Sequence, residues 1–490
     1  MPFLRVFPVL GVVVMAFALT MLVPLGTSLW MRDGAHHAFV WPMVVTGAVG
    51  AVLRGVSPWK HRVDDLQPRD GILLVGLVWT LLPLFACWPL LVHFHNTGIP
   101  LGFTDAYFEA MSGLTTTGST VLTGLDQMPG SINLWRCFLQ WLGGMGILVL
   151  AVAILPMVGM GGGQLFRAEA TGPMKDAKLT PRITETAKGL WAVYCVLSLA
   201  CVVAYVWGGM SPLDAWIHMF ATLSLGGLSS HDASFGHFQS PRLEWIGVVF
   251  MLLASCNFAL YFAAFKKRQP LRVWRDVEWR GTMVLMVTAS GLVAALLVYR
   301  GVYTDVGEAV RVAAFNVVSI ASTTGFSTTD YTLWPVFAPI LMLLLSGVAT
   351  SAGSTGAGIK MLRLLILVKL ARRDMARIIH PRVVNPVTIG GQAVDASTIF
   401  SVLAFMLVYG ATVIGLTMVL LLTDLPFDTA FSAVVASLNN MGPGLNEVGP
   451  AGNYAGLTDF QTWVCTLAML LGRLEMLSFL VLFTRGFWRK

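Results

Sequence analysis

The chain has 490 residues, of which 56% are hydrophobic and only 12% are charged, and its formal net charge is +7. So apolar a composition excludes a soluble enzyme of this size, because hydrophobic stretches near the ~18-residue length that spans a bilayer recur along the whole sequence. The six cysteines lie inside such stretches without a Cys-x-x-Cys pair, so we interpret them as small core residues, not disulfides or metal ligands.

Ten hydrophobic stretches predict membrane helices. In chain order they are 8–30, 38–53, 71–94, 133–158, 190–208, 243–265, 281–299, 335–350, 397–423 and 462–484. We expect helices and not a barrel, because the stretches are continuous and lipid offers no partner for unpaired backbone groups. The first stretch lacks a small-residue cleavage pattern and a second follows closely, so it is predicted to be a retained helix.

Five segments are predicted along the chain. Residues 1–65 form an N-terminal helical hairpin, and four units of similar length follow at 66–185, 186–279, 280–390 and 391–490. Each unit is expected to contain an outer helix, a short re-entrant helix with an acidic or polar start, a glycine turn and an inner helix. The expected fold is therefore an all-α polytopic membrane protein with a pseudo-fourfold repeat of helix, pore helix, filter turn and helix, plus the hairpin.

The glycine turns are the most informative feature of these units. They read Leu-Thr-Thr-Thr-Gly (114–118), Leu-Ser-Leu-Gly-Gly (223–227), Ser-Thr-Thr-Gly-Phe (322–326) and Asn-Asn-Met-Gly-Pro-Gly (439–444). Rings of backbone carbonyls from such turns can replace the water shell of a cation, and glycine permits the required backbone angles. None of the turns contains Asp or Glu, which favours a monovalent over a divalent cation. The alternative is that these glycines only let helices pack closely.

Most of the basic residues are concentrated in five segments of the chain. Of the 32 Lys and Arg, 25 fall in 54–69, 167–188, 266–280, 360–382 and 485–490. By the positive-inside rule these segments and both termini are cytoplasmic, and the four turns face outward. The positive charge is thus a topological signal and does not indicate a nucleic-acid partner.

The third unit contains a segment that is poor in helix formers. Residues 347–360 hold four Gly and several Ser and Thr, which disfavour a helix interior. We interpret the segment as a flexible gate beneath the filter, since irregular backbone at membrane depth is tolerated where it lines a cavity. The alternative is a cytoplasmic turn between two helices, with Lys360 at the membrane face.

Two further features lie outside the turns. Arg473 stands midway along the last hydrophobic segment, where a charge is costly, so it is either an electrostatic barrier or latch on the gate, or half of a structural ion pair. His231 and Asp232 follow the second turn. For them we favour a vestibule or capping role over a metal or proton-relay role.

Several motifs together resemble a known family. They are Ser-Gly-Leu-Thr-Thr-Thr-Gly (112–118), Gln-Trp-Leu-Gly-Gly-Met-Gly-Ile (140–147), Ala-Val-Ala-Ile-Leu-Pro (151–156), Gly-Gly-Leu-Ser-Ser-His-Asp-Ala-Ser (226–234), Ala-Gly-Ser-Thr-Gly-Ala-Gly-Ile-Lys (352–360), Leu-Asn-Asn-Met-Gly-Pro-Gly-Leu (438–445) and Leu-Gly-Arg-Leu-Glu (471–475). With this set of motifs the chain resembles the Trk/Ktr/HKT superfamily of potassium transporters. Within that superfamily it resembles the TrkH/TrkG type of membrane subunit from bacterial Trk systems.

The resemblance implies roles for particular residues. The potassium-binding filter would consist of Thr116, Thr117, Gly118, Leu225, Gly226, Thr323, Thr324, Gly325, Asn440, Met441 and Gly442. The gate would consist of Gly353, Ser354, Thr355, Gly356, Gly358 and Lys360 in the loop, with Arg473 beneath the filter. No catalytic residue and no metal other than potassium is implied.

The resemblance also implies a membrane location, an oligomeric state and a regulatory partner. The chain would be a homodimer in the bacterial inner membrane, in contact with lipid and regulated by a cytoplasmic ring of TrkA-type subunits. Nucleotide would bind that partner, and this chain would hold no tightly bound cofactor. It would work as a gated pore or an ion-coupled symporter. The alternatives are a sodium-dependent Ktr-like transporter, against which the leading hairpin argues, and a non-transporting membrane enzyme or scaffold.

Overall fold

The computed structural model describes residues 5–55, 68–153, 183–383, 385–474 and 476–488. The regular structure in these ranges is helical except for one small antiparallel pair, β1 (Thr388–Ile389) and β2 (Gln392–Ala393). The predicted all-α fold is confirmed. Most of the basic segments 54–69 and 167–188 lies outside the described residues.

The N-terminal hairpin consists of α1 (Val6–Thr20), α2 (Leu22–Met31) and α3 (His37–Gly55). Two glycines set its close packing: a Cβ on Gly11 would lie 2.5 Å from the carbonyl oxygen of Gly50. Small residues permit such an approach of two helix backbones, which is a common way for helices to associate in lipid.

Four groups of helices follow in chain order. The first has α4 (Pro68–Ala86), α5 (Trp88–Thr97), α6 (Phe103–Leu114) and α7 (Gly130–Ala153); the second has α10 (Ile183–Gly208), α11 (Pro212–Ser224), α12 (Pro241–Ala254), α13 (Phe258–Lys266) and α14 (Leu271–Arg275). The third has α15 (Val277–Tyr299), α16 (Val306–Ala321), α17 (Phe337–Ser346) and α18 (Met361–Ile379); the fourth has α19 (Ala396–Leu421), α20 (Phe427–Leu438), α21 (Asp459–Arg473), α22 (Met476–Leu480) and α23 (Arg485–Trp488).

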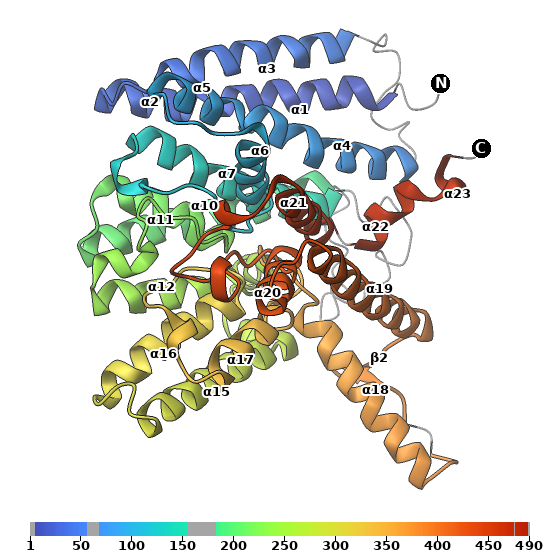
Figure 1. Cartoon of the computed structure of the whole chain (residues 1–490). Helices are drawn as coiled ribbons and strands as arrows, with labels where there is room; N and C mark the ends of the chain where they lie inside the picture. Colours follow the sequence, from blue (N-terminus) through green and yellow to red (C-terminus); the bar gives the residue numbers. More distant parts are fainter. Residues whose placement is uncertain (1–4, 56–67, 154–182, 384, 475, 489–490) are drawn as a thin grey trace.

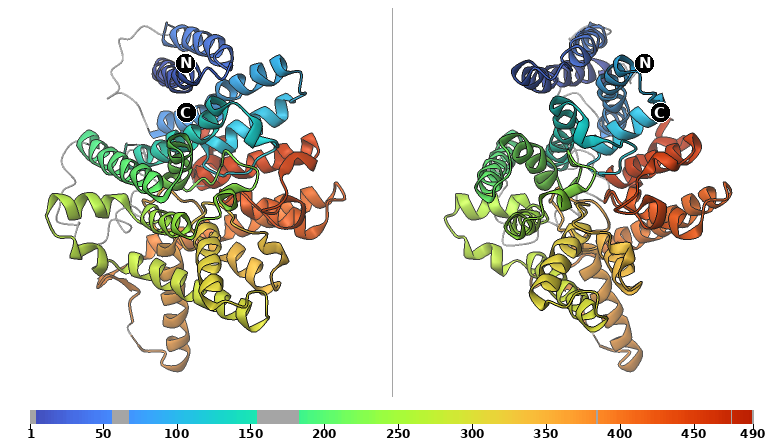
Figure 2. Two further views of the ribbon diagram at one scale, coloured as in Figure 1. Left: turned by 90° about the vertical axis from the view of Figure 1, so that its left-hand side faces the viewer. Right: turned by 60° about the vertical axis from the view of Figure 1, so that its left-hand side comes forward.

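The four groups surround a common centre, with the hairpin outside the first (Figure 2). Short 3-10 turns follow the glycine turns at Leu125–Gln127, Ser234–Phe238, Tyr331–Leu333, Asn446–Val448 and Tyr454–Gly456, and another lies between α22 and α23 at Val481–Phe483. Helix α18 points away from the body (Figures 1 and 2). The short helices α6, α11, α16 and α20 lie inside, so most of their side chains are buried.

Six described helices are long and apolar enough to cross a membrane, and a bent pair adds a possible seventh. That pair is α12 and α13, which meet at 83° where the sequence predicts one continuous stretch over 243–265. The bend has a local cause, because the side chain of Asn257 accepts a hydrogen bond from the N–H of Ala259 and so starts a new helix.

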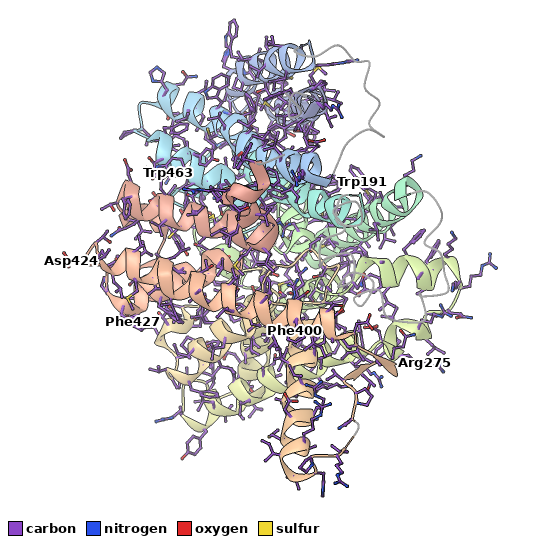
Figure 3. The ribbon with its side chains drawn as sticks, turned by 90° about the vertical axis from the view of Figure 1, so that its right-hand side faces the viewer. Trp191, Arg275, Phe400, Asp424, Phe427 and Trp463 are labelled. Atoms are coloured by element: carbon purple, nitrogen blue, oxygen red, sulfur yellow. The ribbon has the colours of Figure 1, made fainter. Side chains whose placement is uncertain are left out.

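The short helices begin at the acidic and polar positions that the sequence indicates. Ser211 and Asp305 cap α11 and α16 by accepting hydrogen bonds from the N–H groups of Asp214 and Glu308. Such residues suit a helix N-terminus, where unpaired N–H groups and the positive end of the dipole lie. Asp424 and Phe427, at the start of α20, lie at the opposite edge of the molecule from Arg275 of the basic segment 266–280 (Figure 3).

Candidate functional site

The four short helices end in the same backbone conformation. One or two positions after the end of each, one residue adopts a left-handed φ: Thr116 (55°), Leu225 (55°), Thr323 (65°) and Asn440 (48°). The next residue donates its N–H to a carbonyl five positions earlier, at 2.8 Å for Thr117 to Ser112 and 2.9 Å for Met441 to Ala436. Glycine usually occupies the left-handed position of such helix ends, and another residue there costs roughly 1–2 kcal/mol. Strain of this kind concentrates at functional sites.

A glycine with positive φ stands two residues after each left-handed residue. These glycines are Gly118 (84°), Gly227 (71°), Gly325 (88°) and Gly442 (95°). The second turn therefore differs in register from the sequence-based count, which used Gly226 as the counterpart of Gly118. Gly226 occupies the place of Thr117, and its φ is not in the left-handed region. A Gly-Gly pair offers two candidates, and only the backbone conformation distinguishes them.

The four turns touch one another in a closed ring. A Cβ on each glycine would collide with the backbone carbonyl oxygen of the next turn: Gly118 with Gly226 at 1.9 Å, Gly227 with Thr324 at 2.0 Å, Gly325 with Met441 at 2.2 Å, and Gly442 with Thr117 at 2.8 Å. The order runs from the first turn to the fourth and back to the first. All eleven residues predicted for the filter lie in these turns, and Gly227 completes them.

Buried side chains fix the ring from outside. The amide of Gln140 on α7 donates to the Gly226 carbonyl at 2.6 Å and accepts from the N–H of Leu228 at 3.2 Å. The Tyr454 hydroxyl donates to the Gly442 carbonyl at 2.9 Å, and the Asn440 amide donates to the Thr117 hydroxyl at 2.9 Å. The Oδ1 atom of Asn440 is buried and has no hydrogen-bond partner among the described residues.

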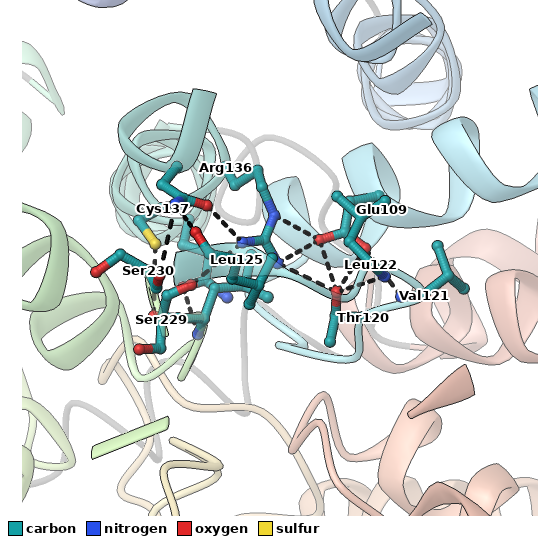
Figure 4. A network of polar contacts seen from close by, with 12 residues as sticks. Glu109, Thr120, Val121, Leu122, Leu125, Arg136, Cys137, Ser229 and Ser230 are labelled. Carbon is teal, nitrogen blue, oxygen red and sulfur yellow. Dashed lines mark hydrogen bonds and ion pairs between the residues drawn. The ribbon is translucent and has the colours of Figure 1, made fainter. Parts of the chain in front are cut away.

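One ion pair beside the ring escaped the sequence analysis. Glu109 on α6 and Arg136 on α7 are both about 1% exposed, and their side chains meet at 2.7 Å. Arg136 also donates to the Ser229 carbonyl at 3.1 Å, and Glu109 accepts from the N–H of Val121 at 3.1 Å (Figure 4). The pair thus ties the first turn to the second. Glu109 and Arg136 lie 27 positions apart on different helices, and no spacing rule pairs residues at that separation.

The segment 347–360 is irregular and lies inside the protein. Helix α17 ends at Ser346 and α18 begins at Met361, and Thr350, Ser354 and Thr355 between them are at most 2% exposed. This segment is therefore an interior loop and not a turn at the surface. Left-handed backbone at Gly353, Gly358 and Lys360 lets it fold back on itself.

The loop packs against the second group of helices and against other parts of its own, third group. The Thr355 hydroxyl donates to the Leu223 carbonyl at 3.0 Å, next to the second turn. The Gly353 carbonyl accepts from the N–H of Phe258 at 3.1 Å, at the bend between α12 and α13. Glu278 on α15 accepts from the N–H of Ala352 at 2.6 Å. A Cβ on Gly356 would lie 3.2 Å from the Thr323 hydroxyl, so the loop reaches the third turn as well.

Arg473 joins this loop to the first group. It is 3% exposed, donates from Nη1 to the Thr355 carbonyl at 2.9 Å and from Nη2 to the Gly143 carbonyl at 3.1 Å, and lies over the Trp79 ring at 5.8 Å. Its partners are carbonyls and an aromatic face, and no carboxylate pairs with it among the described residues. Gly472 allows this placement, because a Cβ there would lie 1.9 Å from the Leu438 carbonyl.

The loops after the first two turns are tied together by carboxylates. Asp232 accepts from the N–H of Leu125 at 3.1 Å, and Asp126 accepts from the N–H of Asp232 at 3.2 Å. Burial alone would raise the pKa of Asp126, but hydrogen bonds from His231 and from the Asp232 amide hold that pKa below its usual range. The capping role expected of Asp232 is thus present.

Comparison with known proteins gives a consistent picture. The model of the TrkH family, described as a cation transport protein, matches residues 43–489. The Trk system potassium uptake proteins TrkH of Vibrio parahaemolyticus and of Escherichia coli are 43% and 41% identical, each over 100% of both chains. The E. coli TrkG protein is 33% identical over 98% of this chain and 97% of its own length. The crystal structure of the potassium transporter TrkH from V. parahaemolyticus superimposes over 100% of both chains, with a TM-score of 0.91 and 40% identity.

Proposed function

The chain belongs to the TrkH family of cation transport proteins, a family of transporters and not of enzymes, and we propose that it takes up potassium through the ring of four glycine turns. The relatives named Trk system potassium uptake proteins match it from end to end, which includes the N-terminal hairpin. The proposed setting is the bacterial inner membrane, with both termini and the basic segments in the cytoplasm.

The observation that carries this proposal is the closed ring. Four turns without a carboxylate meet backbone to backbone, and the negative dipole ends of four short helices point toward them. Carbonyl and hydroxyl oxygens held in this way suit a monovalent cation that has lost its water. The proposed potassium ligands are oxygens of the eleven predicted filter residues together with Gly227.

For the gate, we propose the interior loop 347–360 with Arg473. The Arg473 guanidinium donates to one carbonyl of the loop and to one carbonyl of α7, so the loop and the positive charge lie in direct contact. A positive charge beneath the ring repels a cation electrostatically, and the loop blocks the same path sterically. Opening requires the loop to leave Arg473, and the link from the loop to α18 through Lys360 transmits the movement.

For regulation, we propose a cytoplasmic partner that docks on α18 and the neighbouring basic segments. This helix projects from the body and exposes Arg372 and Arg377 (Figure 1). A ring of TrkA-type subunits that bind nucleotide fits this role, and a homodimer of this chain would present two such helices to it. Neutralising Arg372, Arg373 and Arg377 together is expected to weaken partner binding while membrane insertion persists.

Flux into liposomes tests the proposed function. The purified chain is reconstituted into liposomes, and a potassium gradient is set across their membrane. Uptake of potassium, rubidium and sodium is then followed separately. Potassium uptake that does not require sodium is the expected result. Uptake only with sodium would favour the Ktr-like alternative, and no uptake with or without the partner would contradict a transporter.

A further inference from the structure

Two histidines and an aspartate meet on the face of the molecule where the short helices begin. Asp126 follows the first turn, and His231 and His237 follow the second. The Nδ1 atoms of His231 and His237 lie 2.5 Å and 3.6 Å from the same oxygen, Oδ1 of Asp126. One ligand atom from each residue fits within 4.8 Å of the others, and no other such group of three occurs among the residues that the structure describes.

We propose that Asp126, His231 and His237 bind a divalent transition-metal ion of the Zn²⁺ class. Two imidazole nitrogens and one carboxylate oxygen are a donor set that Zn²⁺ prefers, with water completing a fourth position. Imidazole is a poor ligand for potassium, magnesium and calcium, which take oxygen donors. This site is therefore distinct from the ring of carbonyls, and its occupation does not depend on the proposed potassium uptake.

The carboxylate of Asp214 lies beside the ring of His231. Its Nε2 atom is buried without a hydrogen bond among the described residues and lies 3.4 Å from Oδ1 of Asp214. Histidines that bind a metal through one ring nitrogen commonly donate the other N–H to a carboxylate, which fixes the tautomer and the ring orientation. Asp214 is therefore the carboxylate placed to accept from Nε2–H when Nδ1 of His231 binds the metal.

The imidazole rings of His231 and His237 must also move apart before they can bind one metal ion. They are stacked with centroids 3.5 Å apart and planes within 4° of parallel, whereas a shared metal has to lie in the plane of each ring. His237 can make this change, because its side chain is 45% exposed, while that of His231 is 14% exposed. Exposure of Asp126 and His237 leaves room for the water ligand.

A bound metal would join two structural units. The loop that carries Asp126 leads from the first turn to α7, and the loop that carries both histidines leads from the second turn to α12. Asp232 already links these loops, because its carboxylate accepts from the N–H of Leu125 and its own N–H donates to the Asp126 carboxylate. The metal would add coordinate bonds between the two loops.

Calorimetric titration of Zn²⁺ into the purified, tag-free full chain in detergent tests the site. We expect saturable binding of one Zn²⁺ per chain that weakens at least about tenfold in His237→Ala and in Asp126→Asn. His237 is half exposed, so its replacement leaves the fold intact, and a melting curve without metal verifies this. Co²⁺ should give visible d–d absorption in the parent chain and lose it in both variants.

The control uses another pair of histidines. His36 and His37 stack at 3.8 Å in the N-terminal hairpin but belong to no group of three metal-ligating residues in the described ranges. The double variant His36→Ala/His37→Ala should bind Zn²⁺ as the parent does. The proposal is overturned if the parent binds no stoichiometric Zn²⁺, if His237→Ala and Asp126→Asn bind it unchanged, or if only the control variant loses it.

Discussion

The neighbouring glycines of the second turn allow a sharp test of the ring. In Gly227→Ala the new Cβ would lie 2.0 Å from the Thr324 carbonyl oxygen, whereas real Cβ contacts essentially never fall below 3.0 Å. Backbone must therefore move by about 1 Å, and the left-handed φ of 71° adds roughly 1–2 kcal/mol. That dihedral strain alone shifts a conformational equilibrium by roughly 5–30-fold, and the collision adds to it.

Gly226→Ala is expected to disturb the ring much less than Gly227→Ala. Its Cβ would meet the Gln140 amide at 2.5 Å, which is the end of a flexible side chain, and its φ is not in the left-handed region. Displacing this amide loses up to two hydrogen bonds at about 1 kcal/mol each, but leaves the four turns in contact. In a Gln140→Ala background the obstacle is already gone, so Gly226→Ala should add little, while Gly227→Ala should keep its full effect.

The assay is rubidium uptake in liposomes, normalised to the amount of folded protein, with potassium-limited growth of a host that lacks other uptake systems as a second readout. We expect Gly227→Ala to lose at least about 5-fold in flux or in potassium-over-sodium selectivity in both backgrounds. If Gly226→Ala is the more damaging change in the Gln140→Ala background, the register and the ring built on it are wrong.

Three further changes probe the loop and the ion pair. Arg473→Ala, or deletion of 354–358, should raise basal flux and weaken its dependence on a cytoplasmic partner; less flux than the parent without the partner would make the loop a structural connector. Glu278→Ala removes the acceptor for the Ala352 N–H, so basal flux should also rise, and Glu278→Gln, which keeps an acceptor oxygen, should stay near the parent. Arg136→Met leaves the Glu109 charge buried without its partner and should cost about 3–5 kcal/mol, seen as a lower Tm in detergent, with partial recovery when Glu109→Gln is added; an unchanged Tm would contradict this.

Much of the fold follows from local sequence signals. Long apolar stretches, polar helix starts and repeated glycine turns each have a local physical cause, and the described helices and turns agree with them. The irregular loop 347–360 was also predictable, because glycine and hydroxyl residues disfavour helix whatever surrounds them. Its contact with Arg473 agrees with the interpretation of that arginine as a latch on the gate, since the 2.9 Å hydrogen bond to the Thr355 carbonyl is present.

Other features depend on contacts between distant segments. The pairing of Glu109 with Arg136 and the meeting of Asp126 with two histidines join residues that no spacing rule connects. The choice of Gly227 over Gly226 depends on which carbonyl of the neighbouring turn approaches. The bend at Asn257 has a local cap, but the Gly353 carbonyl that accepts the Phe258 N–H at this bend comes from the third unit. Sequence periodicity contains no information on such approaches.

The central claim is that the four turns form one potassium site, and anomalous scattering from rubidium tests it most directly. Crystals of the chain grown with rubidium in place of potassium should show a peak enclosed by the turns of Gly118, Gly227, Gly325 and Gly442, which is lost when sodium replaces rubidium. A rubidium peak elsewhere in the molecule, with none inside the ring, would contradict the account.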